Sequence, residues 1–397
     1  MADGTTLEDG VWVTRSTEPL ANGEFALRVS VPVVTASRVD TYGDPTSAFI
    51  QMGKNYVDLP IGFGVVSITG NSKPLSASAA AIKAAVDAVP IVHSKAENAY
   101  ISTYTQKYLN TLSATDSVQV QTITPITDAF APVDRLSIGA ISGHDAQVID
   151  ASLMAVGSTV LSHAQFIVVL GTAAVDMAAN GHFVIGDDAS QVFQEVSRGG
   201  TVYAGGGNDT LKTSFGLARI DTLFHGGKGY DTLNVEPSTI EQRAGYVLVT
   251  GGHQVTMKLI NVEQIVMGSQ IIDITATTAQ KAIATLYQNI LGRQADLDGF
   301  GYWDNQVNTG QSLGQVAITM TRSTESGNTL FNGQTSHDLD TLYNVILHRA
   351  TDPVGKAYWS AQIDQGHQTL EQVAQGFVTS NELVGAYLQQ NQWDFLV

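Results

Sequence analysis

The sequence contains no cysteine among its 397 residues. This absence excludes disulfide bonds, thiolate catalysis, and zinc or iron–sulfur centres built on cysteine. Stability must then come from side-chain packing or from a metal ion held by oxygen ligands.

Basic residues and long apolar runs are also scarce. There are 20 Lys plus Arg against 37 Asp plus Glu, a formal net charge of −17, so the positive surface that binds nucleic acid is missing. The longest apolar run near the centre, residues 166–170, is far shorter than the roughly 20 residues of a membrane-spanning helix. The first ten residues lack the basic and apolar segments of a Sec signal peptide. We therefore expect no nucleic-acid partner, no membrane insertion and no Sec export.

Recognisable catalytic motifs are missing as well. The chain has no H-E-x-x-H zinc-protease motif, no G-x-S-x-G nucleophile elbow, and no Walker or dinucleotide glycine pattern. His144 beside Asp145, and His182 near Asp187 and Asp188, leave open an acid–base site that only folding would assemble. The expectation is a protein that is not an enzyme, with an unrecognised site as the less favoured alternative.

Glycine and aspartate are concentrated in two short segments near the middle of the chain. Residues 226–234 match the calcium-binding nonapeptide G-G-x-G-x-D-x-U-x at each fixed position, and residues 204–212 miss only the first glycine. Glycine permits left-handed turns that expose carbonyl oxygens, aspartate supplies a hard anionic oxygen, and the following leucine packs inside a parallel β-roll. The two segments predict calcium binding rather than two ordinary glycine-rich turns.

These segments resemble the RTX family, the hemolysin-type calcium-binding repeats of exported proteins. The resemblance implies that Asp209 and Asp231 are side-chain ligands of Ca²⁺. It also implies that backbone carbonyls complete the coordination, from Gly205, Gly207, Gly227 and Gly229. Residues 213–225 depart from the pattern, keeping only Asp-Thr-Leu at 221–223, which indicates a short roll without a full row of ions.

The carboxyl end carries a second resemblance. Asp394 is followed by three apolar residues, as in the uncleaved signal that type I ABC exporters recognise. An ordinary hydrophobic chain end is the alternative. Together with the RTX segments, this end implies export through such an exporter and an extracellular location, either secreted or associated with the cell surface.

The 397 residues, 43% of them hydrophobic, can form several cores, and the pattern predicts a mixed, multidomain fold. Residues 1–135 read as a β-rich domain with a helical hairpin inserted, its helices at 76–89 and from the Ser94 capping box to residue 112. Period-two alternation over residues 25–33 predicts a strand, and Pro32, which lacks an N–H for the ladder, predicts that this strand lies at a sheet edge or a bulge.

Residues 136–272 read as a central parallel β-roll or solenoid. Counting back from Leu211 in steps of nine reaches an apolar residue each time, as the inward position of a solenoid requires. These residues are Val202, Phe193, Val184, Val175 and Phe166. Residues 246–250 and 261–267 read as closing strands.

Residues 273–397 contain an internal repeat, in which Leu286-Tyr287 of the first unit recurs as Leu342-Tyr343 of the second. Capping boxes at Ser312 and Thr369 predict three helices per unit. The region resembles a helical domain of unknown function that accompanies RTX proteins. Asp296 and Asp298 before Gly299 could begin a calcium loop, or Asp296 could cap the next helix.

These features predict a type I-secreted, calcium-dependent structural protein that self-assembles into a surface layer or filament. Its partners would be further copies of itself and the exporter. Addition of a strand at the predicted Pro32 edge, with the preceding residues 1–22, is a possible mode of assembly. A calcium-dependent adhesin that binds a glycan or a host surface is the alternative.

Overall fold

The computed structural model describes residues 3–20, 23–53, 55–128, 135–139, 144–195, 199–213, 222–251, 256–327 and 330–383. The chain divides into two compact units, Met1–Ile240 with Leu248–Asp273, and Glu241–Val247 with Ile274–Val397. The first is built from strands with one helical hairpin, and the second mainly from helices. The predicted mixed fold, β-rich, then solenoidal, then helical, is confirmed.

Six antiparallel strands open the first unit. They are β1 (Gly4–Glu8), β2 (Val11–Pro19), β3 (Phe25–Val31), β4 (Ser47–Met52), β5 (Asn55–Pro60) and β6 (Phe63–Thr69). Buried and exposed residues alternate at the start of β2, where Val11 and Val13 face the core and Trp12 faces solvent. The strands belong to two sheets, β1-β2-β3-β6 in one and β4-β5 in the other.

Pro32 does not mark a sheet edge, and that prediction was wrong. β3 lies between β2 and β6, and its last partner in the ladder with β6 joins Val31 to Val65. Pro32 therefore follows the paired residues, where its missing N–H costs the ladder nothing. Residues 4–19 form the hairpin β1–β2, so β1 is the terminal strand of this sheet.

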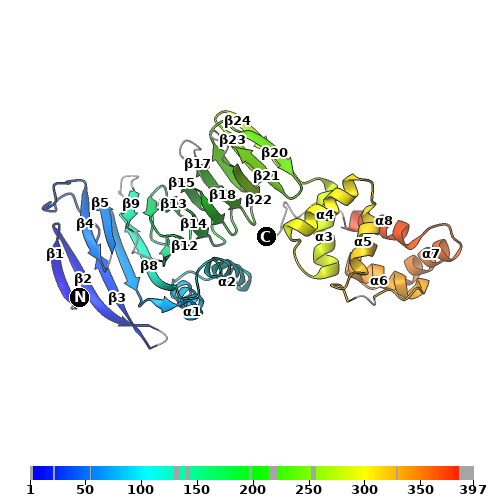
Figure 1. The fold of residues 1–397 in the computed structure, drawn as a ribbon, viewed down its shortest axis with the longest axis horizontal. Helices are drawn as coiled ribbons and strands as arrows, with labels where there is room; N and C mark the ends of the chain where they lie inside the picture. Colours follow the sequence, from blue (N-terminus) through cyan, green and yellow to red (C-terminus); the bar gives the residue numbers. More distant parts are fainter. Residues whose placement is uncertain are drawn as a thin grey trace. The chain divides into compact units, whose positions relative to one another are not determined.

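Two stacks of parallel strands form the central solenoid (Figure 1). One stack contains β8 (Ser117–Thr127), β10 (His144–Asp150), β12 (Phe166–Leu170), β14 (His182–Ile185), β16 (Gly200–Tyr203) and β18 (Thr222–His225). The other contains β9 (Arg135–Ile138), β11 (Thr159–Ser162), β13 (Ala174–Met177), β15 (Val192–Glu195), β17 (Thr210–Thr213) and β19 (Thr232–Val235). β8 pairs with β6 and β9 with β5, so both sheets continue from the N-terminal strands.

The inward side chains recur as predicted over most of the solenoid. Val184 pairs with Val202 and Val175 with Phe193, and all four side chains are fully buried. Phe166 breaks the count, because the partner of Val184 on the preceding turn is Ile167. Phe166 instead stacks on Tyr108 of the helical hairpin at 4.5 Å.

The hairpin consists of α1 (Leu75–Asp87), preceded by the short strand β7 (Lys73–Pro74), and α2 (Lys95–Leu109). It packs on the outer face of the first stack (Figure 1). Tyr104 of α2 stacks on Tyr203 of β16 with ring centroids 3.8 Å apart. The aromatic face of α2 thus forms a second core with the solenoid.

Five further strands follow the two stacks. They are β20 (Thr239–Arg243), β21 (Tyr246–Thr250), β22 (Thr256–Ile260), β23 (Gln264–Met267) and β24 (Gln270–Asp273). β22 extends the first stack by pairing with β18, and β23 extends the second by pairing with β19.

The helical unit shows three helices per repeat, as predicted. The first repeat has α3 (Thr278–Leu286) with the π-helical turn η2 (Tyr287–Leu291), α4 (Leu297–Asn308) and α5 (Leu313–Thr321). The second has α6 (Thr335–Leu347), α7 (Pro353–Asp364) and α8 (Leu370–Val378). None of the helices that the structure describes is long and apolar enough to cross a membrane. Asp394 and the export signal predicted with it lie outside the described residues.

Candidate metal centre

The two glycine-rich segments form turns that stack in register at one end of the parallel strands. Residues 204–209 connect β16 to β17, and residues 226–231 connect β18 to β19. A parallel bridge joins Gly206 to Lys228 across the two turns. Residues 186–191, between β14 and β15, form the preceding turn. A hydrogen bond joins it to the next turn, because the N–H of Gly206 donates to the carbonyl oxygen of Asp187 at 2.8 Å.

The predicted carbonyl ligands all lie in turns that only glycine fits. Gly205, Gly207, Gly227 and Gly229 have φ values of 102°, 89°, 100° and 138°. A Cβ on Gly227 would lie 2.0 Å from Gly205 O, and one on Gly229 would lie 1.5 Å from Gly207 O. The carbonyls of one turn therefore abut the Cα atoms of the next.

A ladder of acidic side chains runs beside these glycines, one from each turn. Asp209 Oδ1 accepts the N–H of Gln191 at 2.7 Å, and Asp231 Oδ1 accepts the N–H of Asp209 at 2.8 Å. Glu263 Oε2 accepts the N–H of Asp231 at 2.7 Å, which adds a third carboxylate. The strand pairing of Thr232 with Gln264 places Glu263 level with Asp231, so these residues hold equivalent positions on successive turns.

The second oxygen of each aspartate is left without a hydrogen-bond donor. Asp209 and Asp231 are fully buried, and the Oδ2 atom of each has no partner among the residues that the structure describes. A buried carboxylate oxygen without a donor or cation is costly. The ladder thus presents two hard, buried oxygen atoms from adjacent turns.

The pKa values of the two aspartates also indicate a cation site. Burial, followed by the charge of Asp231, raises the pKa of Asp209 to about 9. Burial raises the pKa of Asp231 to about 7. Both carboxylates resist ionisation unless a cation compensates their charge, and oxygen donors of this kind suit Ca²⁺. The residues present therefore fit the ion that the sequence predicts.

Two residues of this region, Glu263 and Gln191, were not predicted from the sequence. Gln191 holds the same register position on its turn as Asp209 does on the next, since Val192 pairs with Thr210. Between Asp231 and Glu263 the chain inserts the strands β20 and β21. A regular spacing could have revealed Gln191, but this insertion hid Glu263.

The other acid–base pairs considered from sequence have different bonding partners. His144 Nε2 pairs with Asp116 at 3.3 Å, and His182 Nδ1 lies 3.2 Å from Ala179 O. Asp187 accepts the N–H groups of Gly171 and Ala189.

Asp296 caps a helix. Its side chain accepts the N–H of Gly299 at 2.7 Å at the start of α4, and Asp352 does the same for α7. Arg293 pairs with Asp296 at 3.0 Å. Of the two interpretations of this loop, the structure shows the helix cap.

Burial of His182 predicts a pH-dependent loss of stability. Burial lowers its pKa from 6.5 to about 4, so the folded state keeps it neutral while the unfolded state takes up a proton. Below pH 6.5 the unfolded state binds more protons, and the free energy of unfolding falls with pH until about pH 4. The loss is at most about 3 kcal/mol.

Urea unfolding between pH 4 and 7 measures this effect. A flatter pH profile is expected for His182→Gln, whereas the exposed control His163→Gln keeps the wild-type slope. Identical slopes for all three proteins would show that His182 is not responsible.

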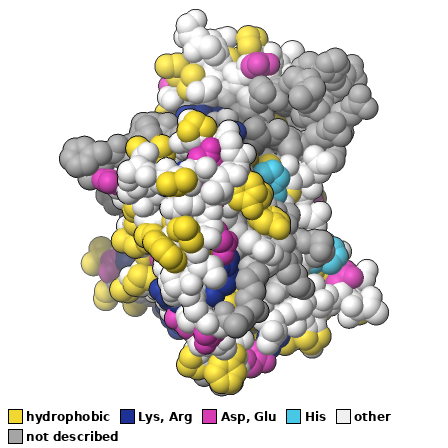
Figure 2. Space-filling view, turned by 90° about the vertical axis from the view of Figure 1, so that its left-hand side faces the viewer, with side chains coloured by type: hydrophobic (Ala, Val, Ile, Leu, Met, Phe, Trp, Pro, Cys, Tyr) yellow, Lys and Arg dark blue, Asp and Glu magenta, His cyan; other side chains and the backbone are white. Residues whose placement is uncertain are grey.

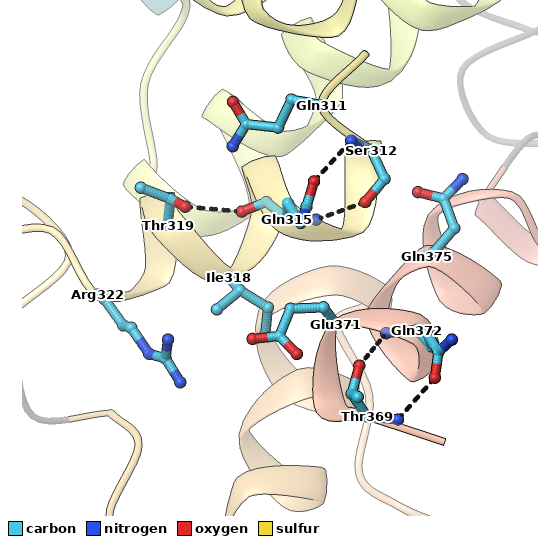
Figure 3. A pocket seen from close by; sticks show the side chains of 10 residues that line it. All are labelled: Gln311, Ser312, Gln315, Ile318, Thr319, Arg322, Thr369, Glu371, Gln372 and Gln375. Carbon is cyan, nitrogen blue, oxygen red and sulfur yellow. Dashed lines mark hydrogen bonds between the residues drawn. The ribbon is translucent and has the colours of Figure 1, made fainter. Parts of the chain in front are cut away.

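A polar groove in the helical unit lies between α5 and α8 (Figure 3). Its sides carry the two capping boxes that the internal repeat relates, Ser312 with Gln315 and Thr369 with Gln372. The N–H of Gly314 donates to Gln375 Oε1 at 2.7 Å, which holds the two helices together. The capping and packing roles of these side chains account for the groove.

The helical unit is the part of the chain with a detectable relationship to other proteins. No curated protein and no solved structure matches the chain. Residues 273–330 and 332–387 each match the family model described as Domain of unknown function (DUF4214). The two matched segments correspond to the internal repeat, so the similarity to this domain of unknown function occurs twice in tandem in the C-terminal part of the chain.

Proposed function

We propose that this chain is an RTX-type, calcium-dependent extracellular structural protein that leaves the cell through a type I ABC exporter and self-assembles into a surface layer or filament. The observation that carries the proposal is the pair of buried carboxylates, Asp209 and Asp231, each with one unsatisfied oxygen in stacked glycine-rich turns.

Calcium would neutralise the buried ladder and supply the cation that its oxygen atoms lack. Asp209 and Asp231 would hold the ion through Oδ2 while their Oδ1 atoms keep the turns in register. Carbonyls of Gly205, Gly207, Gly227 and Gly229 would complete the shell, as the RTX resemblance implies. Without calcium the buried carboxylates must either repel each other or take up protons, and both weaken the roll relative to its calcium-bound form. The chain would therefore cross the exporter unfolded and fold outside the cell, where calcium is abundant.

Self-assembly would use the open edge at β1. Among the strands that the structure describes, β1 pairs only with β2, and it carries exposed Leu7 opposite exposed Trp12. Hydrophobic side chains are visible on this end of the molecule (Figure 2). An edge strand with exposed apolar side chains is a template for pairing with another chain.

Electron microscopy of the purified protein in millimolar calcium and in excess chelator tests this function. Ordered sheets or filaments are expected with calcium and dispersed particles with chelator. Leu7→Lys places a charge on the edge strand and should prevent assembly. Val156→Lys, at a residue 94% exposed in a loop, is the control. Dispersed particles of the wild type in both conditions would contradict the proposal.

An adhesin is the second candidate, and one surface feature favours it. Phe49 and Tyr56 stack at 4.8 Å on neighbouring strands and are 43% and 46% exposed, and Tyr42 packs edge-on against Phe49. Exposed aromatic faces of this kind can stack on sugar rings. A monomer that binds glycans in calcium, with loss of binding in Tyr56→Ala, would favour this candidate.

A further inference from the structure

Three metal-ligating side chains outside the glycine-rich turns meet where α2 begins. His93 lies just before the N-cap of α2 and Glu97 lies in its first turn, whereas Asp187 comes from the turn between β14 and β15, distant in the sequence. One ligand atom of each lies within 4.8 Å of the others. The structure thus gathers an imidazole and two carboxylates from two separate elements.

All three groups are withdrawn from solvent. The side chains of His93 and Glu97 are 4% and 6% exposed, and Asp187 is 2% exposed. His93 Nε2 is buried with no hydrogen-bond partner in the described part of the chain. A cation stabilises two neighbouring buried carboxylates that otherwise disfavour each other's ionised form, and an imidazole nitrogen is a common metal ligand.

The surrounding hydrogen bonds fix the two carboxylates in place. Glu97 Oε2 accepts the N–H of Ser94 at 3.0 Å as part of the capping box, and Oε1 lies 2.7 Å from His93 Nδ1. Asp187 Oδ2 accepts the N–H of Gly171 at 2.6 Å. Ligands held in this way by neighbouring groups are typical of built metal sites.

We propose that His93, Glu97 and Asp187 form a second divalent metal site that prefers zinc-like ions over Ca²⁺. The imidazole sets the preference, because nitrogen ligands suit Zn²⁺ and neighbouring transition metals whereas Ca²⁺ takes oxygen. With three protein ligands, a water molecule would complete a tetrahedral shell. The ion would fasten the start of α2 to the solenoid. This site does not depend on the proposed function.

The test is a Zn²⁺ titration of the full chain in saturating calcium, with stoichiometry from calorimetry. His93→Gln and Glu97→Gln should each bind one zinc fewer than the wild type. Glutamine at residue 97 can still complete the capping box, so the second variant keeps the helix start. His144→Gln is the control and should bind as the wild type does, since His144 pairs with Asp116 at a separate place in the fold.

Equal zinc stoichiometry and affinity in the wild type and in both site variants would overturn the proposal. Zinc-edge X-ray absorption of the wild type gives a readout that no variant's folding affects. The expected spectrum shows one imidazole among oxygen ligands, and a shell of oxygen alone or of several imidazoles would also overturn it.

Discussion

Asp209→Asn and Asp231→Asn are each expected to abolish the stabilisation of the first unit by calcium while leaving the calcium-free protein at least as stable as the wild type. An amide keeps the acceptor that Oδ1 provides to the N–H of Gln191 or Asp209. It removes a buried carboxyl group whose ionised form is unfavourable without a cation. It also removes the anionic ligand, so the same change has opposite consequences in the two conditions.

Thermal unfolding with and without calcium measures both expected effects on stability. At a calcium concentration about 100 times Kd, the wild type should gain about 2.7 kcal/mol of unfolding free energy, and the variants little or none of it. Asp188→Asn is the matched control, since Asp188 is an exposed aspartate in the preceding turn. A variant that responds to calcium as the wild type does, or one destabilised equally in both conditions, would contradict the assignment of these aspartates.

Among alanine substitutions in the glycine turns that the structure describes, Gly229→Ala should lower the free energy of unfolding the most. Its Cβ would lie 1.5 Å from the carbonyl oxygen of Gly207. The backbone fixes the position of the Cβ, and the oxygen is itself a backbone atom, so no side-chain rotation relieves the clash. Its φ of 138° adds strain for any residue with a side chain. We expect a loss of at least about 4 kcal/mol, the upper range for single substitutions, and loss of calcium binding.

Gly181→Ala separates the cost of the positive φ from the cost of the clash with the neighbouring turn. Gly181 also has a positive φ, 64°, but a Cβ there meets nothing within 4 Å. It should cost only about 1 kcal/mol, the penalty of a left-handed backbone. Urea unfolding of both variants makes the comparison, and equal losses would mean that turn stacking does not set the requirement for glycine.

The solenoid core and the glycine-rich turns could be predicted from sequence for a physical reason. Parallel turns of nearly constant length repeat the same environment, so inward residues such as Val184 and Val202 recur at a fixed spacing. The positive φ of Gly205 and Gly227 likewise follows from the turn that places the aspartate. In the solenoid turn that ends at Val184, the spacing differs from the constant one, so the inward residue is Ile167 and not the predicted Phe166.

Features that depend on distant contacts could not be read from local patterns. Glu263 joins the acidic ladder only because β23 pairs with β19 after an intervening hairpin. Asp187 meets His93 only because α2 packs on the solenoid. Pro32 suggested an edge, but the partners on either side of β3 come from both earlier and later residues. Pairing across such separations is set by tertiary structure.

Hydrogen exchange of the wild-type chain in calcium and in chelator localises the effect of the ion, and therefore decides whether calcium binds in the solenoid turns. We expect calcium to slow exchange of the amides in residues 204–212 and 226–234, including the N–H groups of Asp209 and Asp231. The helical unit, residues 274–383, should exchange alike in both conditions. Unchanged exchange in the two glycine-rich segments, or protection confined to the helical unit, would contradict a calcium site in the solenoid turns.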